Sequence, residues 1–164
     1  MTRNSLRRLA LVLLPVIGLG GMWAGVSAKV QPHAASLHRH PLSGLVVVPL
    51  TITSANGRHR FRVEVAATAK EQERGLMFRK AMSADEGMIF PYKPPQRVYF
   101  WMKNTSLPLD IIYIGADHRI LNIADARPFD ETPLASAGEV INVLEINNGR
   151  AGQLGIGPGD RVDW

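Results

Sequence analysis

Hydrophobic and polar residues alternate along several short stretches of the chain, a pattern typical of β-strands. The clearest example is residues 59–66, where apolar residues share one face and mostly charged residues occupy the other. Residues 45–53, rich in Val, Leu, Ile and Thr, precede this stretch, and Asn56-Gly57 lies between the two. Because Asn-Gly strongly favours a tight turn between strands, the pattern predicts an antiparallel hairpin.

Further short apolar runs, separated by glycine or proline, bring the prediction to about eight strands. The additional strands are expected at residues 88–90, 97–102, 109–114, 119–124, 140–146 and 161–164. Prolines make residues 91–95 a stiff connector between strands. Residues 127–139, which are polar and interrupted by proline, are expected to form an irregular excursion on the surface.

The apolar pattern changes at two places and predicts two short helices. Thr68 and Glu71 have the spacing of a capping box, which predicts a helix from Thr68 to about Arg79. Gly75 would lie inside this helix, and we interpret it as a place where another backbone passes close by. Residues 148–154 predict the second helix.

The number and spacing of the strands predict a mostly β fold of the α+β class. We expect a compact, mainly antiparallel small barrel or sandwich with two short helices. A chain of 164 residues is of ordinary single-domain size, and the regular pattern begins at residue 45. The prediction is therefore one β-rich domain over residues 45–164.

Basic residues followed by a short apolar run are typical of an export signal. Arginines precede apolar residues 9–19, and small residues end the segment at Ala28. This run is shorter than the ~20 residues that a spanning helix needs. We therefore expect a signal peptide over residues 1–28, cleaved after Ala28, and a periplasmic or secreted protein with no membrane span after cleavage. The minor alternative is an uncleaved N-terminal segment that tethers the domain to the membrane.

Residues 29–44 have no apolar period and contain prolines and histidines, which indicates a flexible linker. His33, His38 and His40 could bind a metal weakly, as His-rich tracts do. We favour a solvated tether, because an unstructured segment must lose conformational entropy before it can hold a defined site.

The composition excludes several classes of function. The chain has no cysteine, which excludes disulfides, thiolate metal sites and a cysteine nucleophile. The formal net charge of +5 becomes +2 without Arg3, Arg7 and Arg8, and no dense basic patch with aromatic residues follows. We therefore expect no nucleic-acid partner. The sequence also lacks a G-x-S-x-G nucleophile motif, a phosphate-binding glycine loop and an H-E-x-x-H motif.

Residues 103–110 place polar side chains between two strongly apolar strands. Lys103, if partly desolvated, could act as a base or a Schiff-base nucleophile, with Asp110 as its counter-charge. Asn104 and Thr105 could bind a ligand, or they could satisfy backbone groups of the turn. Two interpretations stay open, a hydrogen-bonded structural corner and a functional cleft, and we favour the corner.

Several blocks of the sequence resemble the motifs of one known family, in the same order. They are Arg74-Gly75-Leu76-Met77-Phe78-Arg79, Asp85-Glu86-Gly87-Met88-Ile89-Phe90, Phe100-Trp101-Met102-Lys103-Asn104-Thr105, Leu107-Pro108-Leu109-Asp110-Ile111-Ile112, Leu154-Gly155-Ile156 and Gly159-Asp160-Arg161-Val162. On these blocks the chain resembles domain-of-unknown-function family 192 (DUF192). The resemblance implies a small β-rich domain, often exported in bacteria, and implies no activity. Many relatives carry cysteines in the segment that corresponds to residues 127–139, and their absence here removes any disulfide-dependent role.

The leading hypothesis is an exported bacterial accessory or ligand-binding domain, rather than an enzyme, because no recognisable catalytic set occurs. Its polar cleft or corner would be formed by Arg74, Glu86, Trp101, Lys103, Asn104, Thr105 and Asp110. No cofactor is expected, and the partner classes that we consider are an envelope glycan and a protein. The first alternative is a cell-envelope glycan hydrolase or lyase that uses Lys103, Asp110 or Glu86.

The second alternative is a periplasmic Cu(I)-binding protein. Met77, Met88 and Met102 each lie in one of the blocks quoted above, and thioether ligands favour Cu(I). Methionine more commonly fills gaps in hydrophobic cores, so we rank this alternative last.

Overall fold

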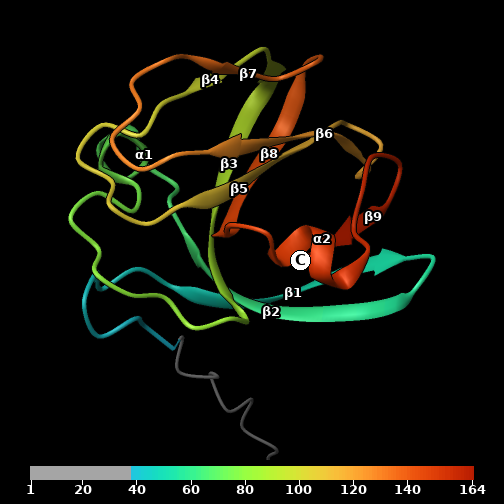
Figure 1. Cartoon of the computed structure of the whole chain (residues 1–164), viewed down its shortest axis with the longest axis horizontal. Helices are drawn as coiled ribbons and strands as arrows, with labels where there is room; N and C mark the ends of the chain where they lie inside the picture. Colours follow the sequence, from blue (N-terminus) through green and yellow to red (C-terminus); the bar gives the residue numbers. More distant parts are fainter. Residues whose placement is uncertain (1–37) are drawn as a thin grey trace, which may run out of the picture. The chain divides into compact units, whose positions relative to one another are not determined.

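The computed structural model describes residues 38–164, which form nine strands and two helices (Figure 1). The strands are β1 (Val47–Ser54), β2 (Gly57–Val65), β3 (Glu86–Gln96), β4 (Tyr99–Phe100), β5 (Leu109–Ile114), β6 (Ile120–Ala126), β7 (Leu134–Ala135), β8 (Val140–Asn147) and β9 (Arg161–Asp163). The helices are α1 (Ala69–Arg74) and α2 (Arg150–Leu154). The predicted signal peptide, and the predicted linker up to residue 37, lie outside the described residues.

Seven strands form one sheet in the order β6-β5-β8-β3-β2-β1-β9, and β4 pairs with β7 in a small second sheet. Every pairing in the large sheet is antiparallel except that of β2 with β3. The sheet is not closed into a barrel, since its edge strands β6 and β9 are not paired with each other as strands. An isolated bridge between Arg119 and Arg161, with a few backbone hydrogen bonds beside it, is what links the two edges. The mostly β, sandwich-like architecture and the predicted hairpin are thus confirmed, and the barrel alternative is wrong.

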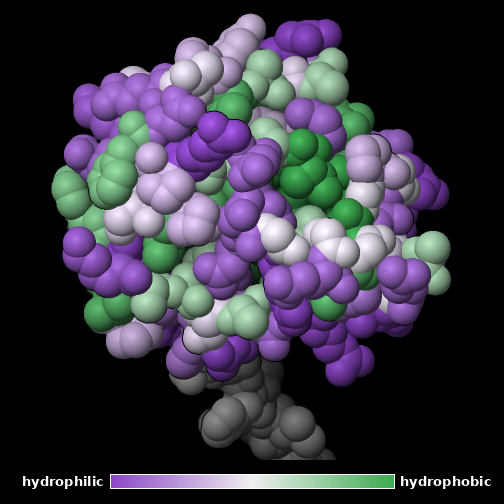
Figure 2. Space-filling view, in the orientation of Figure 1, coloured by the Kyte–Doolittle hydropathy of each residue, from purple (hydrophilic) through white to green (hydrophobic). Residues whose placement is uncertain are grey.

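Apolar side chains cover both faces of the large sheet. In Figure 1, β1 and β2 lie on one side of α2 and β5 and β6 on the other, with β3 and β8 crossing between them. Successive residues of a strand enter different core clusters: Ile89 joins one, while Met88 and Phe90 join the other. All six residues of β5 are buried. On the face of the molecule seen in Figure 2, by contrast, hydrophilic residues surround separate apolar areas.

Helix α1 begins as predicted but ends earlier. The capping box is present, because Thr68 accepts a hydrogen bond from the Glu71 backbone and the Glu71 carboxylate accepts one from the Thr68 backbone. The helix ends at Arg74, since Gly75 has φ +45°, a value that L residues other than glycine rarely adopt. A Cβ at Gly75 would lie 3.5 Å from the Phe90 ring, so left-handed backbone geometry explains the glycine, and the expected close backbone does not.

Two of the predicted strand boundaries are wrong. The Pro-rich residues 91–95 continue β3 instead of connecting strands, and the register with β8 shifts between Pro91 and Gln96. Such an irregularity tolerates prolines, which cannot donate to a sheet ladder. The segment 127–139, expected to be irregular, contributes β7. β7 pairs with residues more than thirty positions earlier, and short-range patterns do not reveal such pairing.

The end of the predicted linker is hydrogen-bonded to the domain. Arg39 forms a bridge with Val46, and the Ser43 hydroxyl donates to the buried Glu64 carboxylate. Arg79 also pairs with Glu64, with 2.8 Å between Arg79 Nη2 and Glu64 Oε1, and the His40 ring lies 3.7 Å from the same oxygen. This network fixes residues 38–44 against β2 and the segment that follows α1.

Candidate functional site

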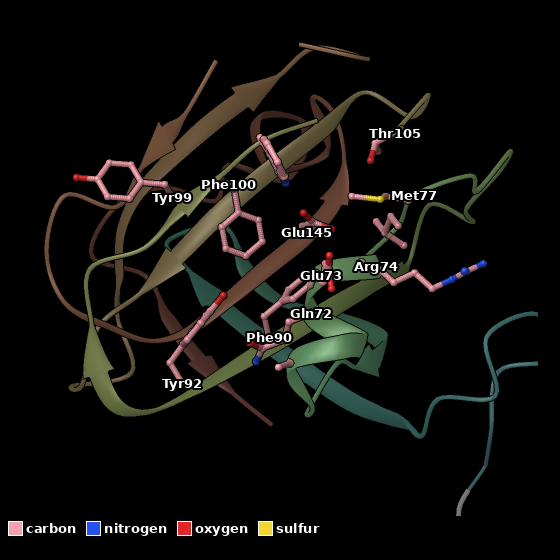
Figure 3. A pocket seen from close by; sticks show the side chains of 14 residues that line it. Gln72, Glu73, Arg74, Met77, Phe90, Tyr92, Tyr99, Phe100, Thr105 and Glu145 are labelled. Atoms are coloured by element: carbon pink, nitrogen blue, oxygen red, sulfur yellow. The ribbon is translucent and has the colours of Figure 1, made fainter. Parts of the chain in front are cut away.

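A cavity of about 320 Å³ opens beside the C-terminal end of α1 (Figure 3). Aromatic residues from β3 and from the segment around β4 form much of its wall: Phe90, Tyr92, Tyr99, Phe100 and Trp101. The Phe90 and Phe100 rings meet edge to face with 5.1 Å between centroids. These aromatic walls and the turn after α1 enclose a space large enough for a small organic molecule.

Glu145 of β8 also lines this cavity, although it belongs to the interior of the sheet. Its Cα is paired with Met88 on β3 and with Ile111 on β5, so apolar residues flank it on both sides. The side chain is buried, with 5% of its surface exposed. On the neighbouring strand, a Cβ on Gly87 would lie only 2.5 Å from the Glu145 carbonyl oxygen. The absent side chain therefore lets β3 approach β8 closely at this point.

The Glu145 carboxyl group forms no ion pair with any residue of the part of the chain that the structure describes. Within residues 38–164, its Oε2 atom is buried and accepts no hydrogen bond. Burial raises the pKa of Glu145 from 4.5 to about 8, because water no longer stabilises the charged form. Burial and the Glu145 charge together raise the pKa of Tyr92 to about 12. At neutral pH Glu145 is therefore mostly a neutral acid that can donate a hydrogen bond into the cavity.

Helix α1 is fixed against β3 and supplies polar groups to the cavity. Gln72 donates a side-chain hydrogen bond of 2.9 Å to the Pro91 carbonyl, which holds the helix on the strand. The Glu71 carboxylate is used by the capping box, and the backbone hydrogen bonds there lower its pKa. In Figure 3 the Glu73 side chain extends towards the part of the cavity that holds Glu145, whereas the Arg74 side chain points away.

The bend at residues 103–107 is held mainly by backbone bonds to two other turns. Phe78 N donates to the Asn104 carbonyl over 2.9 Å, and Phe129 N donates to the Thr105 carbonyl over 3.1 Å. Phe78, Asn104 and Phe129 all have left-handed φ values, of 63°, 53° and 61°. Such values are unusual for aromatic residues and persist only where the surrounding structure imposes them. Three strained turns therefore meet beside the cavity.

The structure brings several predicted residues together at this cavity. Arg74, Trp101 and Thr105 line it, as does Met77. Lys103 does not reach the interior, and its ammonium group lies 5.1 Å from the centre of the Trp101 ring on the surface. Asn104 does not line the cavity but contacts Met77, which does, with 3.9 Å between the Asn104 amide nitrogen and the Met77 sulfur.

Asp110 and Glu86 lie elsewhere. Asp110 is not paired with Lys103; its carboxylate accepts hydrogen bonds of 2.9 Å from the backbone N–H groups of Gly149 and Ala151. It thereby caps the N-terminal end of α2, whose own N-cap residue, Gly149, has no side chain for this role. Glu86 pairs with Arg62 at 3.2 Å and caps the turn at Ser83.

The three methionines do not form one cluster around a cavity. Met88 and Met102 are 1% exposed and belong to the apolar core, whereas Met77 lines the cavity wall. Within the described part of the chain, no group of three His, Asp or Glu side chains is arranged to hold a metal ion. Neither helix among residues 38–164 is long and apolar enough to cross a membrane.

Sequence reasoning missed Glu145, because residues 140–146 form a strand of nearly uniform apolar character. The alternation of side chains between the two faces of the strand contained a signal for this site. Glu145 shares a face with Val143, between Leu144 and Ile146, in a strand that apolar strands flank on both sides. A carboxyl group at an inward position of a central strand is unusual enough to indicate a site.

Residues 51–164 match the DUF192 family, described as an uncharacterized ACR. The chain belongs to the DUF192 family. This membership confirms the resemblance found in the sequence blocks. No curated protein gives a significant match to the chain.

Two crystal structures resemble this DUF192 chain. A protein of unknown function from Novosphingobium aromaticivorans is 55% identical, with a TM-score of 0.77, over 80% of this chain and 94% of that one. A protein from Sinorhizobium meliloti, described as a candidate transcription regulator, is 38% identical, with a TM-score of 0.70, over 73% of this chain and 94% of its own. The family and the first of these structures carry no assigned biochemical role.

Asp110 is expected to stabilise the domain, whereas Lys103 is not. Asp110→Ala leaves buried N–H groups without an acceptor and should lower the free energy of unfolding by about 2 kcal/mol or more. Asp110→Asn, which keeps one acceptor oxygen, should lose less. Lys103→Ala removes only an exposed cation–π contact, at about 1 kcal/mol or less. Urea unfolding measures all three, and equal losses for Asp110→Ala and Lys103→Ala would contradict this assignment.

Glu145 is expected to make stability depend on pH in a specific direction. Its pKa is about 8 in the folded protein and near 4.5 when unfolded, so the folded state binds the proton more tightly. Stability therefore falls as pH rises from about 4.5 to 8, by at most ~1.4 kcal/mol per pH unit from this group. Glu145→Gln should remove this pH dependence. The stability of the variant relative to the wild type should therefore increase as pH rises from about 4.5 to 8. A stability difference that does not vary with pH would show that Glu145 titrates normally.

Proposed function

We propose that the domain binds a small ligand with a cationic head group, such as an ammonium ion, in the cavity that Glu145 lines. The observation that carries this proposal is the buried Glu145 carboxyl group, whose Oε2 atom has no hydrogen-bond partner within residues 38–164. A buried carboxylate is costly unless it is paired. A bound cation would supply the missing counter-charge and would lower the pKa of the carboxyl group, so that it ionises on binding.

The aromatic walls support the same class of ligand. Cations are attracted to the faces of aromatic rings, and Lys103 shows this at the exposed Trp101 ring. Inside the cavity, Tyr92 and Phe100 would offer further rings to a cationic head group. The exposed Glu73 on the rim adds a second carboxylate, which would attract cations towards the opening.

A second candidate function, cell-envelope glycan hydrolysis, is favoured by one observation. A carboxylic acid that stays protonated near neutral pH can serve as a general acid at a glycosidic bond, and aromatic walls suit sugar rings. The two carboxyl groups of this hypothesis are Glu145 and Glu73. The residues that the sequence suggested, Lys103, Asp110 and Glu86, lie in separate parts of the domain. This hypothesis ranks second. A glycosidase holds its two carboxyl groups at a defined separation, and the exposed Glu73 side chain on the rim is not held at a fixed distance from Glu145.

Titration with tetramethylammonium tests the leading proposal, since this probe keeps its charge at every pH. Only ionised Glu145 can pair with it, so affinity should rise with pH and level off above about 8. Below that value it should fall about tenfold per pH unit. Glu145→Gln keeps the shape and hydrogen-bonding capacity but not the charge, and it should abolish binding. Calorimetry at several pH values measures both effects.

Glu86→Gln is the matched control, because Glu86 is paired with Arg62 away from the cavity, and it should bind the probe normally. Binding that is independent of pH, or equal in Glu145→Gln, would refute the cation proposal. If tetramethylammonium does not bind while the wild type cleaves peptidoglycan fragments and Glu145→Gln binds them without cleavage, the hydrolase is correct instead.

We also propose that the domain acts outside the cytoplasm, as the N-terminal sequence predicts. The supporting features are the arginines and the short apolar run of residues 1–28. Expression of the full chain in a bacterial host, followed by fractionation and mass spectrometry, should find a periplasmic protein that begins at Lys29. A protein retained in the cytoplasm with residues 1–28 intact would contradict the proposal, and a membrane-bound full-length product would support the tether.

A further inference from the structure

A second and larger concavity, of about 590 Å³, lies on the other side of the turn that follows α1. It is bounded by residues 42–45, by α1 and by residues 77–81. Arg74, Gly75 and Met77 line both this concavity and the Glu145 cavity. The two spaces therefore share the turn after α1 as a common wall.

Two large apolar side chains line this concavity and are exposed to an unusual degree. Leu42 is 77% exposed and Phe78 is 62% exposed, and the less exposed Leu45 and Met77 lie with them in the lining. Phe78 keeps its left-handed backbone because its N–H donates to the Asn104 carbonyl. The fold thus imposes an unfavourable backbone conformation and leaves an aromatic side chain in contact with water. Exposed apolar groups held in this way are typical of binding surfaces.

Positive charge exceeds negative charge around the apolar part of this concavity. Lys70, Arg74 and Lys80 line the concavity and are exposed, and none of them forms an ion pair within the described residues. The acidic residue in the lining, Glu71, is ionised, because the backbone hydrogen bonds of the capping box lower its pKa, and it contributes one negative charge. Arg79, also in the lining, is neutralised by Glu64. The lining therefore combines apolar side chains with three cations that form no ion pair within residues 38–164, against the single negative charge of Glu71.

We propose that this concavity binds an anionic amphiphile, a molecule with one apolar chain and a carboxylate head. The chain would lie against Leu42 and Phe78, and the carboxylate would meet Lys70, Arg74 and Lys80. The volume lies within the range of small-molecule sites, which are mostly apolar with a few polar groups that fix orientation. A bilayer surface is flat and would touch only the outer edges of a concave surface, so the ligand is a single free molecule.

Decanoate is the probe, used with the full chain at concentrations below those at which it forms micelles. We expect saturable binding with one site, seen by calorimetry and by NMR shifts at Phe78 and Lys80. 1-Decanol has the same chain without the charge and should bind about tenfold more weakly. Equal binding of the two probes, or NMR shifts confined to other surfaces, would overturn the proposal.

Variants separate the charge from the apolar contact. Lys70→Glu combined with Lys80→Glu should weaken decanoate binding about tenfold or more, whereas Arg58→Glu, at the exposed hairpin turn, should not change it. Phe78→Asn also should weaken binding, and asparagine tolerates left-handed backbone, so thermal unfolding should confirm that the variant folds. If the Lys70 and Lys80 double variant and Arg58→Glu bind decanoate equally, the assigned site is wrong.

Two further measurements distinguish the ligand source and the two cavities. Sedimentation with phosphatidylglycerol vesicles should show no binding, and vesicle binding without decanoate binding would assign the surface to a membrane instead. Glu145→Gln should bind decanoate normally, whereas the Lys70 and Lys80 double variant should still bind tetramethylammonium. The two proposals are therefore tested independently, and one can fail while the other is confirmed.

Discussion

The large sheet is covered on both faces, and this constraint governs the rest of the domain. An antiparallel sheet with one wet face alternates polar and apolar residues, but β5, β8 and the first half of β3 have no wet face. Their side chains enter one of two apolar clusters, on opposite sides of the sheet. A polar group in these strands must therefore be paired, capped or reached by something from outside.

Asp110 and Glu145 are two buried carboxyl groups in this sheet that differ in whether the protein supplies their hydrogen-bond partners. Both lie on strands that are paired on both sides. Glu145 lies between Met88 and Ile111, whereas Asp110 lies between Ile146 and Asp125. Asp110 is satisfied by the backbone of α2, so its charge is part of the architecture. Glu145 has an oxygen without a partner and lies beside a cavity. The contrast separates a structural carboxylate from a functional candidate, although the sequence alone made Asp110 the more conspicuous of the two.

The bend at residues 103–107 belongs largely to the architecture. Its carbonyl groups at Asn104 and Thr105 accept backbone hydrogen bonds from the turns at Phe78 and Phe129, and Ser106 donates to the Arg79 carbonyl. Segments far apart in the sequence are thereby tied at one place, beside the cavity wall. The corner interpretation accounts for these contacts, and the bend serves the cavity by positioning Trp101 and Thr105.

Local signals predicted the features that depend on neighbouring residues. Alternation gave the β1–β2 hairpin, and the spacing of Thr68 and Glu71 gave the start of α1. The end of α1 was missed because Gly75 is compatible with a helix unless its φ is known. The partners of Asp110 lie about forty residues away, so only the folded chain reveals them. Glu145 was missed because the importance of its position depends on the strands beside it.

The turn from Arg74 to Met77 has one face in each of the two cavities. It is short, it leaves α1 through a glycine with left-handed backbone, and Gly75 N is bonded back to the Glu71 carbonyl. The buried Leu76 side chain anchors this turn in the apolar core, whereas Arg74, Gly75 and Met77 line both cavities. Any ligand that displaces this turn from one cavity alters the shape of the other, and thermodynamic reciprocity then requires each occupant to change the affinity of its neighbour by the same factor.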